Sequence, residues 1–188
     1  MRQRFVSVMM GALCLLLMVA NRVAAQPYRQ LTVSDFRGTP RPGGNNAIAH
    51  TKCSINFRYE AVGRGADFRL ISDVRLTVDP YYSWIDLKRV TSPKQLDRIL
   101  NHEQGHYIIS YMEQQELTRQ INRLQFDPYN YKYQASNLFN RIHAKYQQLN
   151  QNYDIGTQNM RDEQQQRSWD VYFQKRLSTA PPLEAEGY

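Results

Sequence analysis

The chain contains 188 residues, 41% of them hydrophobic, which is enough for one domain with a buried core. Its formal net charge is +7, but the first 25 residues contain three arginines and no acidic residue. Removing those three charges from +7 leaves +4 for residues 26–188. The remaining basic residues are interspersed with Asp and Glu, so the composition does not favour nucleic-acid binding.

The N-terminus has the three parts of a secretory signal peptide. Arg2 and Arg4 precede an apolar run over residues 5–20, and small residues at positions 23–25 provide a cleavage site. The run is short for a membrane span, and no second apolar stretch follows it. We therefore predict that residues 1–25 are a cleaved signal peptide. The mature protein is expected to be secreted or periplasmic, without stable insertion in the membrane.

The predicted mature chain contains a single cysteine, Cys53, so it cannot form an internal disulfide. A lone cysteine in a strand-like sequence is usually a small buried residue. A metal ion bound by this chain would therefore have histidine, carboxylate or water ligands.

The first half of the mature chain predicts β-structure. Residues 31–36 resemble a short strand, and residues 37–44 are a loop by composition. Apolar and polar residues alternate over 47–60 and again over 68–78, which is the pattern of strands buried on one face. A third strand or extended segment is expected over 81–90. Because short turns join these segments, we expect a small antiparallel sheet arranged as a meander.

The pattern changes to a helical period after this sheet. Ser92 and Gln95 form a capping box, with Pro93 at the first helical position, which is a strong helix start. The helix is expected to end near residue 125, before the Asp-Pro pair that follows.

Two further helices are predicted by apolar residues at three- and four-residue spacing, over residues 135–153 and 159–177. Residues 178–188 contain two prolines with small or acidic residues and are expected to be a disordered tail. The overall prediction is an α+β fold in one domain over residues 26–177, with the N-terminal sheet packed on about three helices.

The first helix contains the sequence His102-Glu103-Gln104-Gly105-His106, which is the H-E-x-x-H pattern of zinc metalloproteases. Histidines four residues apart lie on one helix face, about 6 Å apart, so both rings can bind one tetrahedral Zn²⁺. Glu103 would face the open side of the metal and act as a general base on its water. The alternative is two ordinary helix-face histidines beside a solvated glutamate. Gly105 costs the helix about 1 kcal/mol relative to Ala and either allows a close approach to the metal or is a tolerated defect.

Two histidines do not complete a zinc site, and a third protein ligand is expected. Glu113 and Glu116 lie on a suitable face of the same helix, but Glu113 is about 10 Å beyond His106 along the axis. The third ligand must therefore come from another segment, and the available side chains are His50, His143, Asp154, Asn159, Asp162 and Glu163. For His143, a partly buried core position is the simpler interpretation.

Several motifs occur in a characteristic order along the mature chain. They are residues 31–38, the strands that end near Trp84, residues 100–107 around the metal motif, and residues 153–157, followed by Gln164 and Trp169. In this order they resemble the bacterial family known as domain of unknown function 922 (DUF922), whose members are predicted secreted zinc-dependent proteases. The resemblance covers nearly the whole mature chain. It implies a zincin-like metallopeptidase that acts on peptide or protein substrates.

The chain departs from that family at Ile108, where an acid is usual, and, more importantly, after residues 153–157. The family usually continues Tyr-Asp-x-x-Thr with x-His-Gly, and the resemblance makes that histidine the natural third ligand. Here Asn159 and Met160 occupy the His and Gly positions. Because asparagine is a much weaker ligand for Zn²⁺, the third ligand stays open among Asn159, Asp154, Glu163 and His143.

The leading hypothesis is a secreted or periplasmic zinc-dependent peptidase, in which His102 and His106 bind Zn²⁺ and Glu103 is the catalytic base. The alternative, favoured by Asn159, is an exported metal-binding or protein-interaction module on a degenerate zincin scaffold. Such a module would bind its partner through an aromatic surface. The candidates are Tyr81, Tyr82 and Trp84, which are also explained as the core and rim of a strand.

Overall fold

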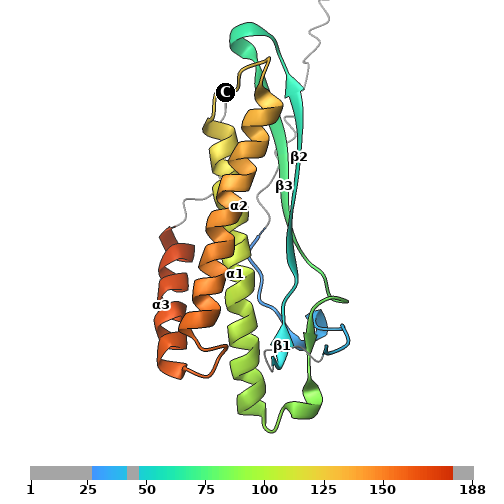
Figure 1. Cartoon of the computed structure of the whole chain (residues 1–188), viewed down its shortest axis with the longest axis vertical. Coiled ribbons are helices and arrows are strands. Elements are labelled where there is room, and N and C mark those ends of the chain that lie inside the picture. The colour runs from blue at the N-terminus through green and yellow to red at the C-terminus, as the bar shows by residue number, and fades with distance from the viewer. Residues whose placement is uncertain (1–26, 42–46, 180–188) are drawn as a thin grey trace, which may run out of the picture.

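A computed structural model of the chain describes residues 27–41 and 47–179 (Figure 1). Within these residues there are three α-helices and four β-strands, so the predicted α+β class is confirmed. The predicted signal peptide and the last nine residues of the expected tail lie outside the described residues. The strands are β1 (Ala49–His50), β2 (Cys53–Val62), β3 (Arg69–Val78) and β4 (Trp84–Ile85), and the helices are α1 (Pro93–Arg123), α2 (Tyr131–Gly156) and α3 (Glu163–Thr179).

The strands form two separate antiparallel pairs within the described residues. β2 and β3 are a long hairpin in which Cys53 pairs with Val78 and Val62 pairs with Arg69. β1 pairs with β4. The expected three-stranded meander is therefore wrong, because the third strand is only two residues long and does not pair with β3.

A side-chain turn explains why the third strand is so short. The Asp79 carboxylate accepts the backbone N–H groups of Tyr81 at 3.0 Å and Tyr82 at 3.2 Å, which turns the chain directly after β3. The N–H of Gly38 donates to the Ser83 carbonyl at 2.8 Å and holds the turn against the N-terminal segment. These local bonds occupy backbone groups that a continuous strand would need for pairing.

All three predicted helices are present, with ends that differ by a few residues from the expected ones. α1 starts as the capping box indicates, because the Ser92 hydroxyl accepts the Gln95 N–H at 3.2 Å. α2 starts four residues earlier than expected, α3 starts four residues later, and α3 continues to Thr179. None of the helices in the described part of the chain is long and apolar enough to cross a membrane.

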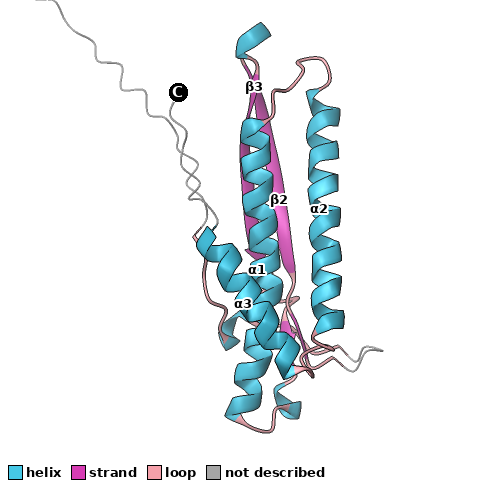
Figure 2. Ribbon diagram, turned by 90° about the vertical axis from the view of Figure 1, so that its left-hand side faces the viewer, coloured by secondary structure: helices cyan, strands magenta, loops and turns pink. Residues whose placement is uncertain are grey.

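α1 is the central element of the fold. The β2–β3 hairpin packs along one side of α1 and α2, and α3 packs on the other side against the N-terminal part of α1 (Figures 1 and 2). The main apolar cluster fills the space between these layers and includes Phe68, Val74, Ile109, Leu117, Ile142 and Phe173.

The N-terminal segment is attached to α1 through Gln104, inside the metal motif. The Leu31 N–H donates to Gln104 Oε1 at 2.7 Å, and Gln104 Nε2 donates to the Tyr28 hydroxyl at 2.9 Å. This segment was expected to be a strand but contains a 3₁₀ turn over Val33–Asp35. The Asp35 carboxylate accepts the Thr32 N–H at 2.8 Å and stabilises the turn. Gln104 therefore points to the N-terminal segment and has a structural role.

α1 and α2 approach each other closely at Gly105. A Cβ atom added at Gly105 would lie 2.4 Å from the ring of Tyr153, which is fully buried. The Tyr153 hydroxyl donates to the His102 backbone carbonyl at 3.0 Å, so the ring cannot move aside without losing a buried hydrogen bond. The glycine is thus explained by helix packing, and neither an approaching strand nor a substrate is needed to account for it.

We predict that Gly105→Ala destabilises the protein by about 1–3 kcal/mol, the usual cost of overpacking a core. The sign of this change separates packing from helix propensity, because propensity alone would make the alanine variant more stable by about 1 kcal/mol. Chemical denaturation measures the change, and Asn122→Ala on the exposed end of α1 is the control, expected to be neutral or slightly stabilising. A Gly105→Ala protein as stable as the wild type would contradict the proposed contact.

Candidate metal centre

Three side chains from two helices converge at one point. His102 and His106 lie one turn apart on α1, and Asp154 lies near the end of α2. Asp154 Oδ1 is 3.3 Å from His102 Nε2 and 3.2 Å from His106 Nε2. In the described part of the chain these three residues form the group of His, Cys, Asp and Glu whose ligand atoms could hold a metal ion, all within 4.8 Å of one another.

The spacing of these atoms fits a tetrahedral ion. Bonds of about 2.0–2.1 Å that meet at tetrahedral angles place neighbouring ligand atoms about 3.3 Å apart. The two nitrogen–oxygen separations, 3.2 Å for His106 and 3.3 Å for His102, have this value. The donor set of two imidazoles and one carboxylate also suits a tetrahedral site that keeps a fourth position for water or substrate.

The second nitrogen of each ring is held by a side-chain amide. His102 Nδ1 lies 3.1 Å from Gln166 Oε1 of α3, and His106 Nδ1 lies 2.7 Å from Asn150 Oδ1 of α2. An amide oxygen only accepts, so each Nδ1 carries a proton. Without a metal ion, a second proton on Nε2 is what Asp154 accepts; once that proton is lost, the lone pair of Nε2 is free to bind a metal ion. This is the tautomer that a metal ligand requires.

The Tyr153 ring packs against both imidazoles and fixes their orientation. It stacks on His102 with ring centroids 4.8 Å apart and 17° between the planes, and it meets His106 edge-on at 5.1 Å. Because Tyr153 directly precedes Asp154 on α2, one short stretch of helix supplies both the support for the rings and the third candidate ligand.

Glu103, the acid of the motif, has a defined partner on the strand side. The Thr51 hydroxyl donates to Glu103 Oε2 at 2.5 Å, and Thr51 directly follows β1. Glu103 is only 2% exposed, yet it lines an open cleft of about 1000 Å³ together with His102, His106 and Asp154. The carboxylate is therefore shielded from bulk water while it still faces a space that a substrate can enter.

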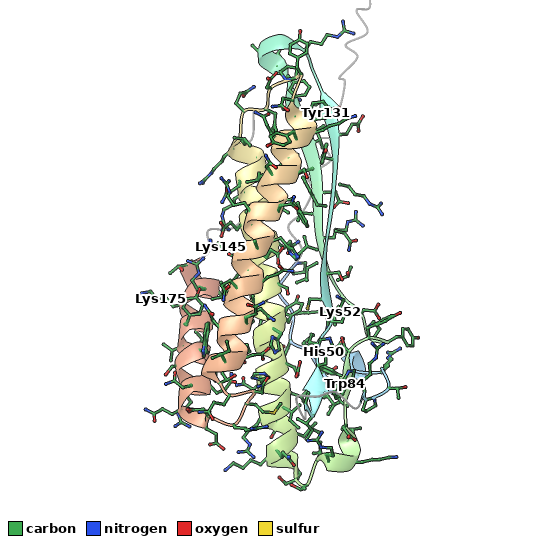
Figure 3. The ribbon with its side chains drawn as sticks, viewed as in Figure 1. His50, Lys52, Trp84, Tyr131, Lys145 and Lys175 are labelled. Atoms are coloured by element: carbon green, nitrogen blue, oxygen red, sulfur yellow. The ribbon has the colours of Figure 1, made fainter. Side chains whose placement is uncertain are left out.

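The cleft runs between the helices and the sheet layer. Its strand wall consists of residues 47–55, and its helix wall comes from α1 and α2. His50 and Lys52 lie at the strand wall, close to Trp84 (Figure 3). The His50 and Trp84 ring centroids are 6.4 Å apart, so this histidine belongs to the strand wall and is not part of the converging group.

The centre favours a positive charge. Burial lowers the pKa of the His106 imidazole, but its hydrogen bond to Asp154 and the nearby Glu103 carboxylate outweigh burial and raise that pKa to about 9. Burial raises the pKa of Asp154, but the hydrogen bonds from both histidines hold it well below its usual range. A proton or a metal cation at this point satisfies the same charge balance.

Of the other three residues considered as third ligands, His143 and Glu163 pair with other side chains, whereas Asn159 lines the cleft. His143 Nδ1 lies 2.8 Å from Glu113 Oε1, further along the cleft, and Glu163 forms an ion pair with Arg98. Asn159 has a positive φ of 51°, and its backbone N–H donates to the Asp154 carbonyl at 2.9 Å.

Local structure explains Asp162, another candidate ligand, and the neighbouring Met160. Asp162 Oδ1 accepts the backbone N–H groups of Gln164 and Gln165 at 3.1 and 2.9 Å, so it caps the start of α3. Met160, where the family resemblance leads us to expect glycine, has a φ of 67°, a left-handed value that glycine adopts without strain.

The aromatic candidates for a partner surface divide between core and rim. Trp84 is buried at 7% exposure, whereas Tyr81 and Tyr82 are 70% and 56% exposed. This arrangement matches the simpler explanation of the three residues as the core and rim of the strand region.

Four residues of the centre were not assigned to it by sequence reasoning: Thr51, Asn150, Tyr153 and Gln166. The spacing of Asn150 and Asp154 offered a usable indication, because positions four apart lie on one face of a helix. Thr51 and Gln166 come from segments far from the motif in sequence, and no local pattern connects them with it.

Residues 22–161 of the chain match the model of a family described as bacterial protein of unknown function (DUF922). The resemblance inferred from the motifs is thereby confirmed. No curated protein and no solved structure matches the chain.

We predict a pH dependence of stability for the metal-free protein. The folded pKa of His106, about 9, is higher than the usual value of about 6.5, so the protonated ring contributes its full stabilisation below about pH 6.5. This contribution is lost as the pH rises through 9. Asp154→Asn removes the charge that holds the proton, so its free energy of unfolding should fall less over the same range.

Chemical denaturation at several pH values, in the presence of a chelator, measures this difference. Asp97→Asn, an exposed acid-to-amide change on α1, is the control and should follow the wild type. An equal decline in wild type and Asp154→Asn would show that Asp154 does not hold a proton on His106.

Proposed function

This chain belongs to the DUF922 family of bacterial proteins of unknown function, and from its site we propose that it is a zinc-dependent metallopeptidase. The observation that carries the proposal is the convergence of His102, His106 and Asp154 beside a buried glutamate at an open cleft. We propose further that the predicted signal peptide exports the protein to the periplasm or beyond, where its substrates would be peptides or proteins.

The donor chemistry supports zinc as the metal. Mg²⁺ and Ca²⁺ prefer sites made entirely of oxygen ligands, whereas two imidazole nitrogens with one carboxylate are a common catalytic zinc set. Bound zinc would supply Lewis acidity towards a carbonyl oxygen and would make a water molecule more acidic. The remaining chemistry falls to the side chains of this chain.

Glu103 is the proposed general base. It follows His102 on the same helix, and its position in the cleft allows its carboxylate to take a proton from water and deliver it to the departing amine. The Thr51 hydroxyl occupies Oε2, so Oε1 is the oxygen available for the proton. The low exposure of Glu103 keeps bulk water from competing for that proton.

The cleft itself suits a chain-like substrate. It is partly open to solvent, and its walls extend from the centre to the pair of Glu113 and His143. One extended backbone segment, residues 47–55, forms one wall. A peptide lying along this segment would pass the three candidate ligands and Glu103.

We predict that the purified protein binds one zinc ion per chain and cleaves peptides, and that Glu103→Gln retains the zinc but loses at least about 100-fold in cleavage rate. A loss of this size is typical for removal of a general base. The measurement combines metal analysis with mass spectrometry of a mixed peptide library, because the sequence preference is unknown.

Asp97→Asn is the matched control, since it also changes an acid to its amide on the same helix but is exposed and lies outside the cleft. It should retain cleavage within a few-fold of wild type. Absence of stoichiometric zinc in the wild type would overturn the metal centre. Zinc binding without any cleavage would leave the non-catalytic metal-binding module as the function.

We also predict that Thr51 acts as a positioning residue for Glu103. Thr51→Val preserves the shape of the side chain but removes the hydroxyl, and it should lower kcat about tenfold, the effect of one hydrogen bond of about 1.4 kcal/mol. KM and zinc content should be unchanged, and Thr51→Ser should restore kcat. A Thr51→Val enzyme with wild-type kcat would show that the hydrogen bond is dispensable.

A further inference from the structure

The polar side chain that α3 buries is directed at the metal centre. α3 begins at Glu163, after the end of the family match at residue 161, and within it only Gln166 and Phe173 are buried. Phe173 belongs to the main apolar cluster, as expected for a packed helix. Gln166 lies instead against His102 and Tyr153, where an apolar residue could have filled the space.

The hydrogen bonds of Gln166 determine which way its amide faces. Its Nε2 donates to Asp170 Oδ1 at 2.9 Å and to the Tyr153 hydroxyl at 2.8 Å, and its Oε1 lies 3.1 Å from His102 Nδ1. A carboxylate accepts hydrogen bonds and cannot donate, so Asp170 must face the amide nitrogen. The amide oxygen is therefore the atom that faces the histidine.

Asp170 is itself held in place from α1. Asn101 Nδ2 donates to both oxygens of this carboxylate, at 3.2 and 3.1 Å. Asn101 directly precedes His102 in sequence. The contacts form a closed ring that starts and ends on α1. Asn101 orients Asp170, Asp170 orients Gln166, and Gln166 contacts His102, the residue after Asn101.

His102 needs this support because Asp154 acts in the opposite direction. A carboxylate oxygen 3.3 Å from Nε2 attracts a proton to that nitrogen, and a protonated Nε2 cannot bind a metal. Gln166 Oε1 instead accepts a hydrogen bond from Nδ1, which stabilises the ring with its proton on that nitrogen. The amide therefore favours the ligand-competent tautomer over the one that Asp154 alone would favour.

We propose that Gln166, oriented by Asp170, is a positioning residue that sets the tautomer and orientation of His102 for metal binding. The inference rests on the proposed metal centre and extends it to α3. It assigns to this helix a direct part in the affinity of the site, in addition to its packing against α1.

The test compares zinc affinities, measured by competition with a chelating indicator, and Co²⁺ absorption spectra of the loaded proteins. Gln166→Met keeps the length of the side chain but removes the acceptor, and it should raise the Kd for zinc about 10–100-fold, as loss of a ligand's hydrogen-bond partner usually does. Gln165→Met, the exposed neighbour on the same helix, is the control and should bind zinc like the wild type.

A double variant separates positioning from packing. Gln166→Glu alone brings a second carboxylate to Asp170 and should weaken zinc binding. Adding Asp170→Asn restores a donor at position 170 and an acceptor towards His102 with no change in net charge, so the double variant should recover an affinity within about threefold of wild type. Helical circular dichroism and thermal unfolding of the metal-free proteins identify any variant that fails to fold.

The outcomes distinguish this inference from the proposed function. A wild type that binds no zinc overturns the proposed function, and the inference with it. A wild type that binds zinc, together with a folded Gln166→Met that binds it equally well with the same Co²⁺ spectrum, overturns the inference alone. If Gln166→Met does not fold, the double variant decides, and failure of a folded double variant to recover affinity also overturns it.

Discussion

The contact between Gly105 and the Tyr153 ring fixes the distance and register of α1 and α2, and the candidate metal centre depends on that register. Asp154 reaches both imidazoles only because it directly follows the tyrosine that lies against the glycine. A slip of one helical turn between the two helices would move its carboxylate by about 5.4 Å, out of reach of both rings. The same tyrosine stacks on His102, so one buried side chain sets the helix spacing and the ring orientation together.

The carboxylates near the two histidines favour binding of a cation at this centre. Glu103 and Asp154 lie close to two imidazoles in surroundings that expose little of His102 and Glu103 to water. Buried carboxylates are costly unless they are paired or hydrogen-bonded. Thr51 satisfies one oxygen of Glu103, and the two histidines satisfy Asp154. The remaining negative charge is balanced by a proton on a histidine or by a metal ion, which are therefore expected to compete.

The parts of this structure that local physics controls were predicted from the sequence. The capping box at Ser92, the alternation along the β2–β3 hairpin and the one-turn spacing of the histidines are all properties of short segments. The strand predicted over 81–90 is mostly absent because the Asp79 side chain accepts the backbone N–H groups that follow it. An alternation pattern of apolar residues does not reveal such side-chain bonds. The third ligand stayed open for a related reason, since helix register depends on contacts between residues far apart in sequence.

The nature of the groups behind the two histidines also has consequences for the chemistry. Asn150 and Gln166 are neutral amides, so they orient the rings without adding negative charge to the centre. When both rings are neutral, as a bound metal would require, Asp154 is the one candidate ligand of the three that carries a formal charge. Carboxylate partners would make the imidazoles more basic and would reduce the Lewis acidity of a bound divalent ion. Neutral partners leave that acidity higher, which supports the proposed activation of water, with Glu103 as the proposed base, over simple storage of metal.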